Sequence, residues 1–312
     1  MIVALASFAL VLLSAPAVTV RLTRGIHPRD WTRWSFAALI VGALAAEAGL
    51  VLFALPTVLR ALGAHALVAA CARMTGSLMP GGPVVGWSAL SVATLGPLAV
   101  ALELLQARRS QHTLSVCVAG VATEQIGDQS VVVIPIGDVL AFTVAGPLPV
   151  IVVSCGMREV MSADQLGAVV RHEASHANHR HDRLLALLAG LERAFVLLPI
   201  VKRSAAAVRC GIERWADEDA AGSTLDGRRL VRDALMRAVF ADTPVGVAAF
   251  GAVATIAVRI DALRWPMRVS AGPRRVLVIA ISVAMLLAVS SAAAGAAELW
   301  RVLVMPAFCD RR

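Results

Sequence analysis

Four of the chain's seven histidines lie in the stretch VVRHEASHANHRHD, residues 169 to 182. His172 and His176 are one helical turn apart, so on a helix both imidazoles project from one face and reach a single metal ion. Glu173 follows the first histidine and lies about 100° round the same helix. This HExxH pattern predicts a zinc site in which two imidazoles and a carboxylate hold the ion, a water takes the fourth position, and Glu173 acts as the general base.

The third metal ligand has two candidates from different protease classes. A metzincin pattern, HExxHxxGxxH, requires glycine at position 179 and histidine at position 182, whereas the chain has His179 and Asp182. In a gluzincin pattern a later helix supplies a glutamate, and the stretch GIERWADEDAA at 211 to 221 offers Glu213 with Asp217 one turn further on. We therefore predict that Glu213 binds zinc and that Asp217 accepts a hydrogen bond from a ligand imidazole. The alternative interpretation of these carboxylates is a solvated acidic face.

The other two histidines of the stretch receive weaker predictions. His179 lies on the ligand face of the predicted helix, where a role beside the ligands or the substrate is possible, but a solvated side chain is the expectation. His181 is expected at the surface.

The elements around the motif are predicted from local patterns. Ser162 followed by Gln165 three residues later forms a capping-box pattern ahead of an apolar-periodic run, which places HExxH on a helix. Upstream, β-branched residues punctuated by glycine and proline predict a small sheet. The predicted strand segments are TLSVCVAG at 113 to 120, VVVIPIG at 131 to 137, and AFTVAGPLPVIVVSCG at 141 to 156.

The composition indicates an integral membrane protein. Of the 312 residues, 58% are hydrophobic and 16% are charged, and the mean hydropathy is +0.76, whereas soluble domains carry about 25% charged residues. The net charge of +8 comes from arginines between apolar segments, which indicates membrane topology and no nucleic-acid binding. The five cysteines form no CxxC pair, so neither a disulfide framework nor a cysteine zinc site is predicted. The segments predicted to span the bilayer are about 2 to 20, 35 to 58, 84 to 106, and 276 to 298.

Arginine positions orient these spans. The loop at 21 to 34 and the run at 259 to 275 are both rich in arginine, so we expect both in the cytoplasm and the N-terminus outside, in a bacterial plasma membrane. The apolar run at 184 to 200 contains adjacent charges, and we predict that it lies along or dips into the cytoplasmic leaflet without crossing. The weaker run at 245 to 258 is also left uncrossed.

The predicted fold is a mainly α membrane protein with about four transmembrane helices and an inserted α+β zinc peptidase domain of gluzincin type. The predicted parts are a three-helix transmembrane region at 1 to 106, a cytoplasmic peptidase domain at 107 to 275, a final helix at 276 to 298, and an external tail at 299 to 312.

Residues 141 to 182 together with ERWADEDAA at 213 to 221 resemble the membrane metallopeptidases typified by the BlaR/MecR β-lactam sensors, which are related to HtpX-type proteases. The likeness covers roughly residues 84 to 221. In such families an edge strand before the metal helix aligns the substrate backbone by strand addition, and AFTVAG at 141 to 146 is the matching stretch. The resemblance implies one zinc ion per chain bound by His172, His176 and Glu213, with Glu173 as general base and Asp217 beside a ligand imidazole.

Three features depart from those sensors. A large extracellular penicillin-binding domain follows their last span, whereas here the 14 residues from 299 to 312 contain no SxxK motif, so direct β-lactam sensing is not expected. The acidic residue that usually ends the HExxH helix falls later in this chain, at Asp182. The chain has no tyrosine, so any side chain that stabilises an oxyanion must be an arginine or a histidine.

Three functions agree with these patterns. The favoured one is a membrane zinc endopeptidase that cleaves a cytoplasmic protein, with a BlaI-like transcriptional repressor as the substrate that the resemblance implies. The second is an HtpX-like protease that clears damaged membrane proteins. The third is a membrane receptor or scaffold that binds zinc without catalysis. The expected partners are a protein substrate and the lipid bilayer.

Overall fold

The structure is a computed structural model. It describes residues 2–20, 25–65, 68, 82–242 and 250–265, together with parts of 272–297, namely 272, 275, 276, 278–287, 289, 290, 293, 294 and 297.

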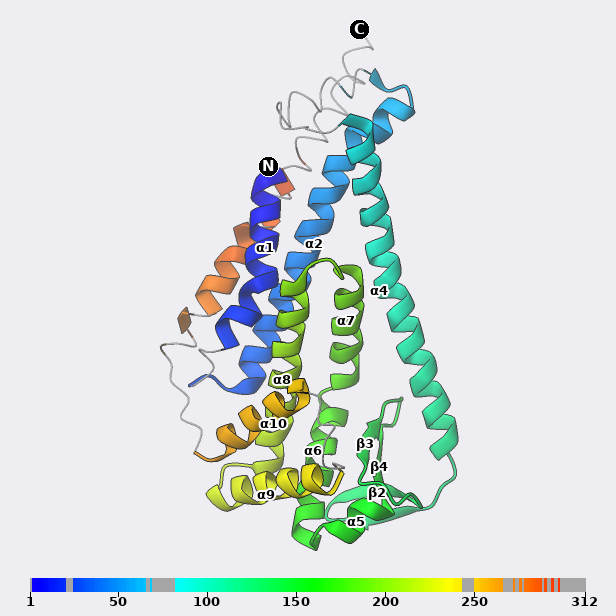
Figure 1. Ribbon diagram of the computed structural model, residues 1–312, viewed down its shortest axis with the longest axis vertical. Helices are drawn as coiled ribbons and strands as arrows, with labels where there is room; N and C mark the ends of the chain where they lie inside the picture. Colours follow the sequence, from blue (N-terminus) through cyan, green and yellow to red (C-terminus); the bar gives the residue numbers. More distant parts are fainter. Residues whose placement is uncertain are drawn as a thin grey trace.

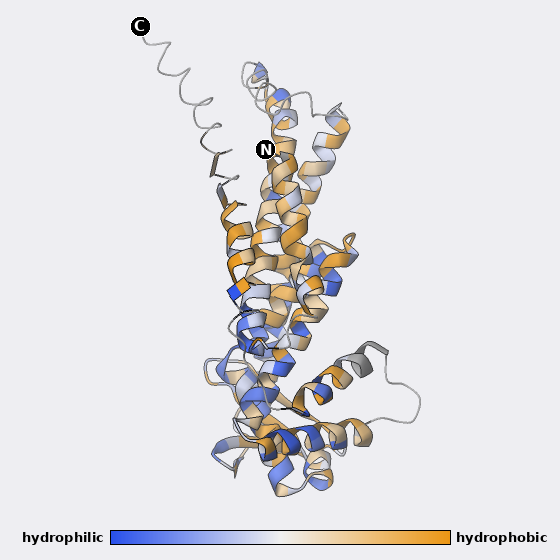
Figure 2. Cartoon of the chain, turned by 90° about the vertical axis from the view of Figure 1, so that its left-hand side faces the viewer, coloured by the Kyte–Doolittle hydropathy of each residue, from blue (hydrophilic) through white to orange (hydrophobic). Residues whose placement is uncertain are grey.

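Three apolar helices form one end of the molecule (Figure 1). They are α1 (Ile2–Thr19), α2 (Pro28–Ala61) and α4 (Gly82–Val118). Figure 2 shows hydrophobic residues along the upper parts of these helices and hydrophilic residues gathered at the opposite end. The polarity of the molecule therefore changes along its long axis.

Two of the described helices, α2 and α4, are long and apolar enough to cross a membrane. Helix α1 and the stretch Val278–Leu287 are apolar but shorter. These helices indicate membrane association, whereas four crossings and their orientation stay predictions. The tail at 299 to 312 lies outside the described residues.

The apolar run at 184 to 200 forms part of a helical hairpin. Helix α7 (His181–Ala194) packs against α4, and α8 (Pro199–Ala221) returns against α1 and α2. A buried cluster of leucine, isoleucine, valine and alanine residues joins the hairpin to α1 and α2. The hairpin therefore lies beside the apolar helices, and α8 leads the chain back toward the end of the molecule that contains the sheet (Figure 1).

The other end of the molecule contains a small mixed sheet of four strands in the order β1-β2-β4-β3. Strand β2 pairs parallel with β4, and the other two neighbouring pairs are antiparallel. Strand β3 is therefore an edge strand. The strand bounds are β1 (Thr123–Ile126), β2 (Gln129–Ile134), β3 (Ala141–Val144) and β4 (Val150–Ser154).

The prediction of a strand at 113 to 120 was wrong, because helix α4 continues to Val118. Valine and threonine have only a modest preference for strands, and a helix already running can include them at a small cost. The predicted strands at 131 to 137 and 141 to 156 are confirmed as β2, β3 and β4. Strand β1 was not predicted.

Helices pack around the sheet and around α8. Helix α6 carries the HExxH motif and contacts β3, α8 and α9. Helix α10 contains most of the run that is predicted to stay uncrossed, and it packs against α8 and α9. Residues 245–249 of that run lie outside the described residues. The bounds of the remaining helices are α5 (Cys155–Val160), α6 (Ala163–Asn178), α9 (Leu225–Asp242) and α10 (Phe250–Leu263).

Candidate metal centre

The HExxH motif lies on α6, as its sequence predicts. Ser162 caps the helix by accepting a hydrogen bond from the Gln165 backbone N–H, and the Gln165 side chain accepts one from the Ser162 backbone N–H. This reciprocal capping box satisfies two backbone donors and sets the start of the helix.

His172, His176 and Glu213 converge on one point between α6 and α8. The two histidine Nε2 atoms are 3.1 Å apart, and they lie 3.5 Å and 3.6 Å from the two Glu213 carboxylate oxygens. Ligands of a tetrahedral zinc ion at about 2.05 Å stand about 3.3 Å from one another. These three side chains therefore fit one zinc ion, and they form the group of potential metal ligands found among the described residues.

The second nitrogen of His172 faces an acidic partner. His172 Nδ1 lies 3.1 Å from Asp217 Oδ1, and the Asp217 side chain is 3% exposed. Burial alone would lower the pKa of His172, but its hydrogen bonds to Asp217 and Glu213 outweigh burial and raise the pKa to about 10. Burial opposes ionisation of Glu213 too, yet His172 and Arg259 lower the pKa of that carboxyl to about 2. The carboxylates around His172 are therefore ionised.

Arg259 on α10 completes this charged group. Its guanidinium donates two hydrogen bonds to Asp217, at 2.8 Å and 2.7 Å, and a third nitrogen lies 3.0 Å from Glu213. The Arg259 side chain is 13% exposed. One planar cation thus connects the predicted third ligand to the residue that orients His172.

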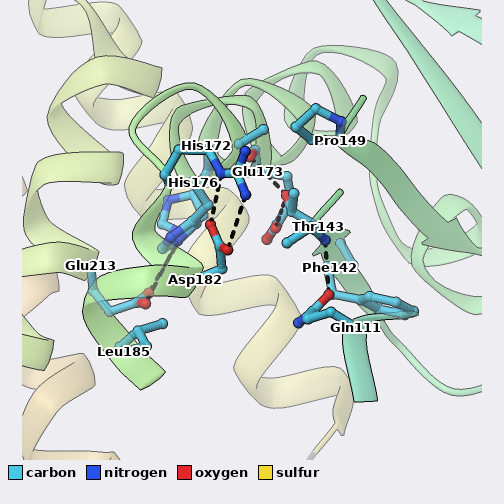
Figure 3. Close-up of a pocket in the computed structure, with 14 residues that line it drawn as sticks. Gln111, Phe142, Thr143, Pro149, His172, Glu173, His176, Asp182, Leu185 and Glu213 are labelled. Atoms are coloured by element: carbon cyan, nitrogen blue, oxygen red, sulfur yellow. Dashed lines mark hydrogen bonds and ion pairs between the residues drawn. The ribbon is translucent and has the colours of Figure 1, made fainter. Parts of the chain in front are cut away.

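Glu173 lies between the metal ligands and the edge strand β3. The Thr143 hydroxyl lies 2.8 Å from the Glu173 carbonyl oxygen and 3.0 Å from its Oε2. Figure 3 shows Glu213 facing the two histidines on one side and Thr143 beside Glu173 on the other. The carboxylate of the HExxH glutamate is thus held at the edge of the sheet.

The prediction that His181 is at the surface was wrong, because the side chain is fully buried. Helix α6 ends at Asn178, and Arg180 adopts a left-handed conformation with φ 51° and ψ 45°. This turn separates α6 from α7 and places His181 at the site, where its Nδ1 lies 2.9 Å from His176 Nδ1. Burial lowers the pKa of His181 to about 3, so its ring is neutral.

His179 is held at the C-terminal end of α6, away from the ligand atoms. Its Nε2 lies 2.9 Å from Asp219 Oδ2, and the Ser175 hydroxyl donates to the same oxygen at 2.7 Å. The His179 ring also lies 4.4 Å from the Trp215 ring, centroid to centroid. His179 therefore helps join α6 to α8.

Two cavities border Glu173 and share Ala141, His172 and Glu213 in their walls. The first, about 260 Å³, follows β3, and Arg180 and Asp182 also line it. The second, about 230 Å³, extends beneath α9 and has mostly apolar walls. Because they share these walls, we interpret them as the two halves of one cleft.

A model of peptidase family M48 matches residues 104–267, more than half of the chain. The matched region includes the HExxH helix, the sheet and the residue Glu213. The chain belongs to peptidase family M48. This membership identifies it as a metallopeptidase, and peptidases of this family are generally zinc-dependent. No curated protein and no solved structure matches the chain significantly.

The M48 region begins within α4 and ends after α10. It contains three residues near the metal ligands, Thr143, His181 and Arg259, whose roles were not predicted from the sequence. Thr143 lies in the stretch 141 to 146, which was predicted only to pair its backbone with the substrate, without a role for any side chain. Arg259 belongs to an arginine-rich run that was interpreted as a topology signal. The hydrogen bond of His181 depends on the left-handed turn at Arg180, which helical periodicity does not reveal.

Proposed function

We propose that this M48 protein is a zinc-dependent endopeptidase, anchored in the plasma membrane by several helices, whose active site faces the cytoplasm. The observation that carries the proposal is the convergence of His172, His176 and Glu213 beside Glu173, at the edge of a sheet. The apolar helices α2 and α4 support the membrane location.

Each residue of the site has a chemical role in this proposal. His172, His176 and Glu213 hold the metal, and Asp217 fixes the orientation of His172. When bound, zinc supplies Lewis-acid activation of a water and of the scissile carbonyl. Glu173 accepts a proton from the attacking water and passes it to the leaving amine. Thr143 keeps the Glu173 carboxylate in place through its hydroxyl.

The edge strand β3 gives the substrate backbone a place to bind. Ser154 of β4 donates its backbone N–H to the Leu140 carbonyl, and antiparallel pairing uses alternate residues. Ala141 and Thr143 therefore turn their backbone groups away from β4, toward the cleft. Further along the same edge, the Ala145 N–H donates to the Gln111 side chain. An extended peptide added at this edge would lie beside Glu173.

The second cavity indicates the kind of side chain that the substrate presents beside the scissile bond. Its walls away from the metal ligands are apolar, and they are formed by Met157, Ala168, Val169, Val231, Ala234, Leu235 and Ala238. An apolar side chain is the best match for such a wall, because it transfers its own surface out of water. We therefore propose that cleavage occurs next to an apolar residue.

The resemblance to BlaR/MecR sensors favours a cytoplasmic repressor as the substrate, and this assignment is a proposal. Membership of family M48 supports a peptidase with a protein substrate and does not select a particular one. The two alternative functions are cleavage of misfolded membrane proteins and zinc binding without catalysis, and the cleavage fragments found in cells distinguish among the three.

The test compares cells that carry the wild-type protein with cells that carry Glu173→Gln, by quantitative proteomics of cleavage fragments. The substitution removes the base and keeps the metal ligands, so we expect fragments to disappear while purified protein retains one zinc ion per chain. His172→Ala and His176→Ala are the matched variants and should lose the zinc. Identical fragments in both cell lines would refute the proposed activity, and undiminished zinc in both histidine variants would refute the site.

A further inference from the structure

His176 has an unusual neighbour for a predicted metal ligand. Its Nε2 points to the metal position, 3.6 Å from Glu213 Oε1, and its Nδ1 lies 2.9 Å from Nδ1 of His181. An imidazole that binds a metal through the lone pair of one nitrogen carries its proton on the other nitrogen. His176 Nδ1–H therefore requires an acceptor, and metal-bound histidines usually find it on a carboxylate, a backbone carbonyl or a water.

The surroundings of His181 suit it to be that acceptor. Its side chain is fully buried, and within the described part of the chain its Nε2 has no hydrogen-bond partner. The ring packs at 4.7 Å against the indole of Trp215. The guanidinium groups of Arg29 and Arg33 on α2 lie over that indole, at 5.7 Å and 5.2 Å from the ring centroid. Burial disfavours a positive charge on the His181 ring.

A neutral imidazole has one donor nitrogen and one acceptor nitrogen. Because His181 Nδ1 faces a nitrogen that must donate, its lone pair lies on Nδ1 and its proton on the partnerless Nε2. The two predicted histidine ligands thus face different hydrogen-bond acceptors. The Nδ1 of His172 faces the Asp217 carboxylate, and the Nδ1 of His176 faces the neutral ring of His181.

We propose that His181 is a positioning residue that accepts the hydrogen bond from His176 Nδ1–H and thereby fixes the tautomer and orientation of this ligand. The proposal rests on the proposed function insofar as it takes His176 to be a zinc ligand. It assigns a role to the histidine that stands nine residues after the first histidine of the motif, and the left-handed turn at Arg180 brings it there.

The test measures the zinc dissociation constant of the full-length protein in detergent by competition with a chelator. In His181→Asn the amide Oδ1 stands where Nδ1 was, so this variant should bind zinc within a few-fold of wild type. In His181→Leu the acceptor is lost, and in His181→Gln it lies one bond too far away. Both should bind zinc about 10 to 100-fold more weakly, as is typical when the partner of a ligand histidine is lost.

Two controls separate positioning from packing. His179→Leu removes another ring that contacts Trp215 without touching a ligand, and it should leave the zinc affinity unchanged. The thermal midpoint of each metal-free variant reports folding independently of zinc. Equal affinities of the Asn and Gln variants, or wild-type affinity in the Leu variant, would overturn the proposal. If the Leu variant does not fold, the comparison of Asn with Gln decides. Undiminished zinc in His176→Ala would instead refute the ligand assignment itself.

Discussion

Replacing Arg259 by methionine should destabilise the protein and weaken zinc binding together. The substitution removes a guanidinium that donates to Asp217 at 2.8 Å and 2.7 Å and lies 3.0 Å from Glu213. It leaves Asp217, whose side chain is 3% exposed, with a buried negative charge and one remaining partner, His172. The loss of stability follows from this uncompensated charge.

The lost contacts of Asp217 set the size of the destabilisation. Breaking a buried ion pair by removing one partner costs about 3 to 5 kcal/mol, and the retained His172 hydrogen bond argues for the lower end, about 3 kcal/mol. For a region of this size each kcal/mol lowers the thermal midpoint by about 2 to 4 °C. The expected fall is therefore about 6 to 12 °C. Because Glu213 also loses its neighbour, zinc affinity should fall by about 10 to 100-fold.

Two comparisons make this prediction specific. Arg228 forms an equally buried pair with Glu218 on the same helix α8, with hydrogen bonds of 2.6 Å and 2.8 Å, so Arg228→Met should lower the thermal midpoint without changing zinc affinity. Adding Asp217→Asn to Arg259→Met removes the uncompensated charge and should recover part of the lost stability. A double variant as unstable as the sum of the two single variants would refute the reasoning.

Three further predictions concern the third ligand, the cleft and the membrane. Glu213→Ala should lower zinc affinity markedly in a chelator competition, and the proposed ligand set fails if His179→Ala is the more damaging. Ala234→Phe fills the second cavity, so cleavage of a peptide library should shift toward small residues beside the scissile bond; an unchanged preference would show that this cavity binds no substrate side chain. Single cysteines at positions 109 and 203, in a background without native cysteines, should both be shielded from a membrane-impermeant reagent in intact cells, and labelling at 203 alone would show that the run at 184 to 200 crosses.

Local patterns were enough to predict the parts of the site that depend on spacing along one helix. The capping pattern at Ser162 and the i, i+4 spacing of His172 and His176 fix which residues share a face of α6, whatever the rest of the chain does. The stretch 113 to 120 is helical up to Val118 although its residues favour a strand, because α4 continues into it from the apolar segment before it.

Contacts that depend on the tertiary fold could not be predicted from one sequence. Arg259 is 42 residues from Asp217. Because it begins an arginine-rich run, its presence in the sequence was already explained as a signal of membrane topology. His181 was expected on the surface because a continuing helix would carry it away from the ligand face. The single residue Arg180, at φ 51°, changes that direction, and left-handed arginine has no sequence signal of the kind that glycine or asparagine gives.

Helix α8 connects the metal site to the membrane helices through its two faces. Glu213 and Asp217 face the histidines, whereas Gly211 and Trp215 face α2. A Cβ at Gly211 would lie 2.6 Å from the Trp31 ring and from the Thr32 hydroxyl, so the two helices meet at a distance that only glycine permits. This contact is two residues from the predicted third ligand. Helix α2 lies outside the region that matches family M48, yet it packs against α8, so the position of the helix that carries Glu213 depends in part on a membrane helix outside the matched region.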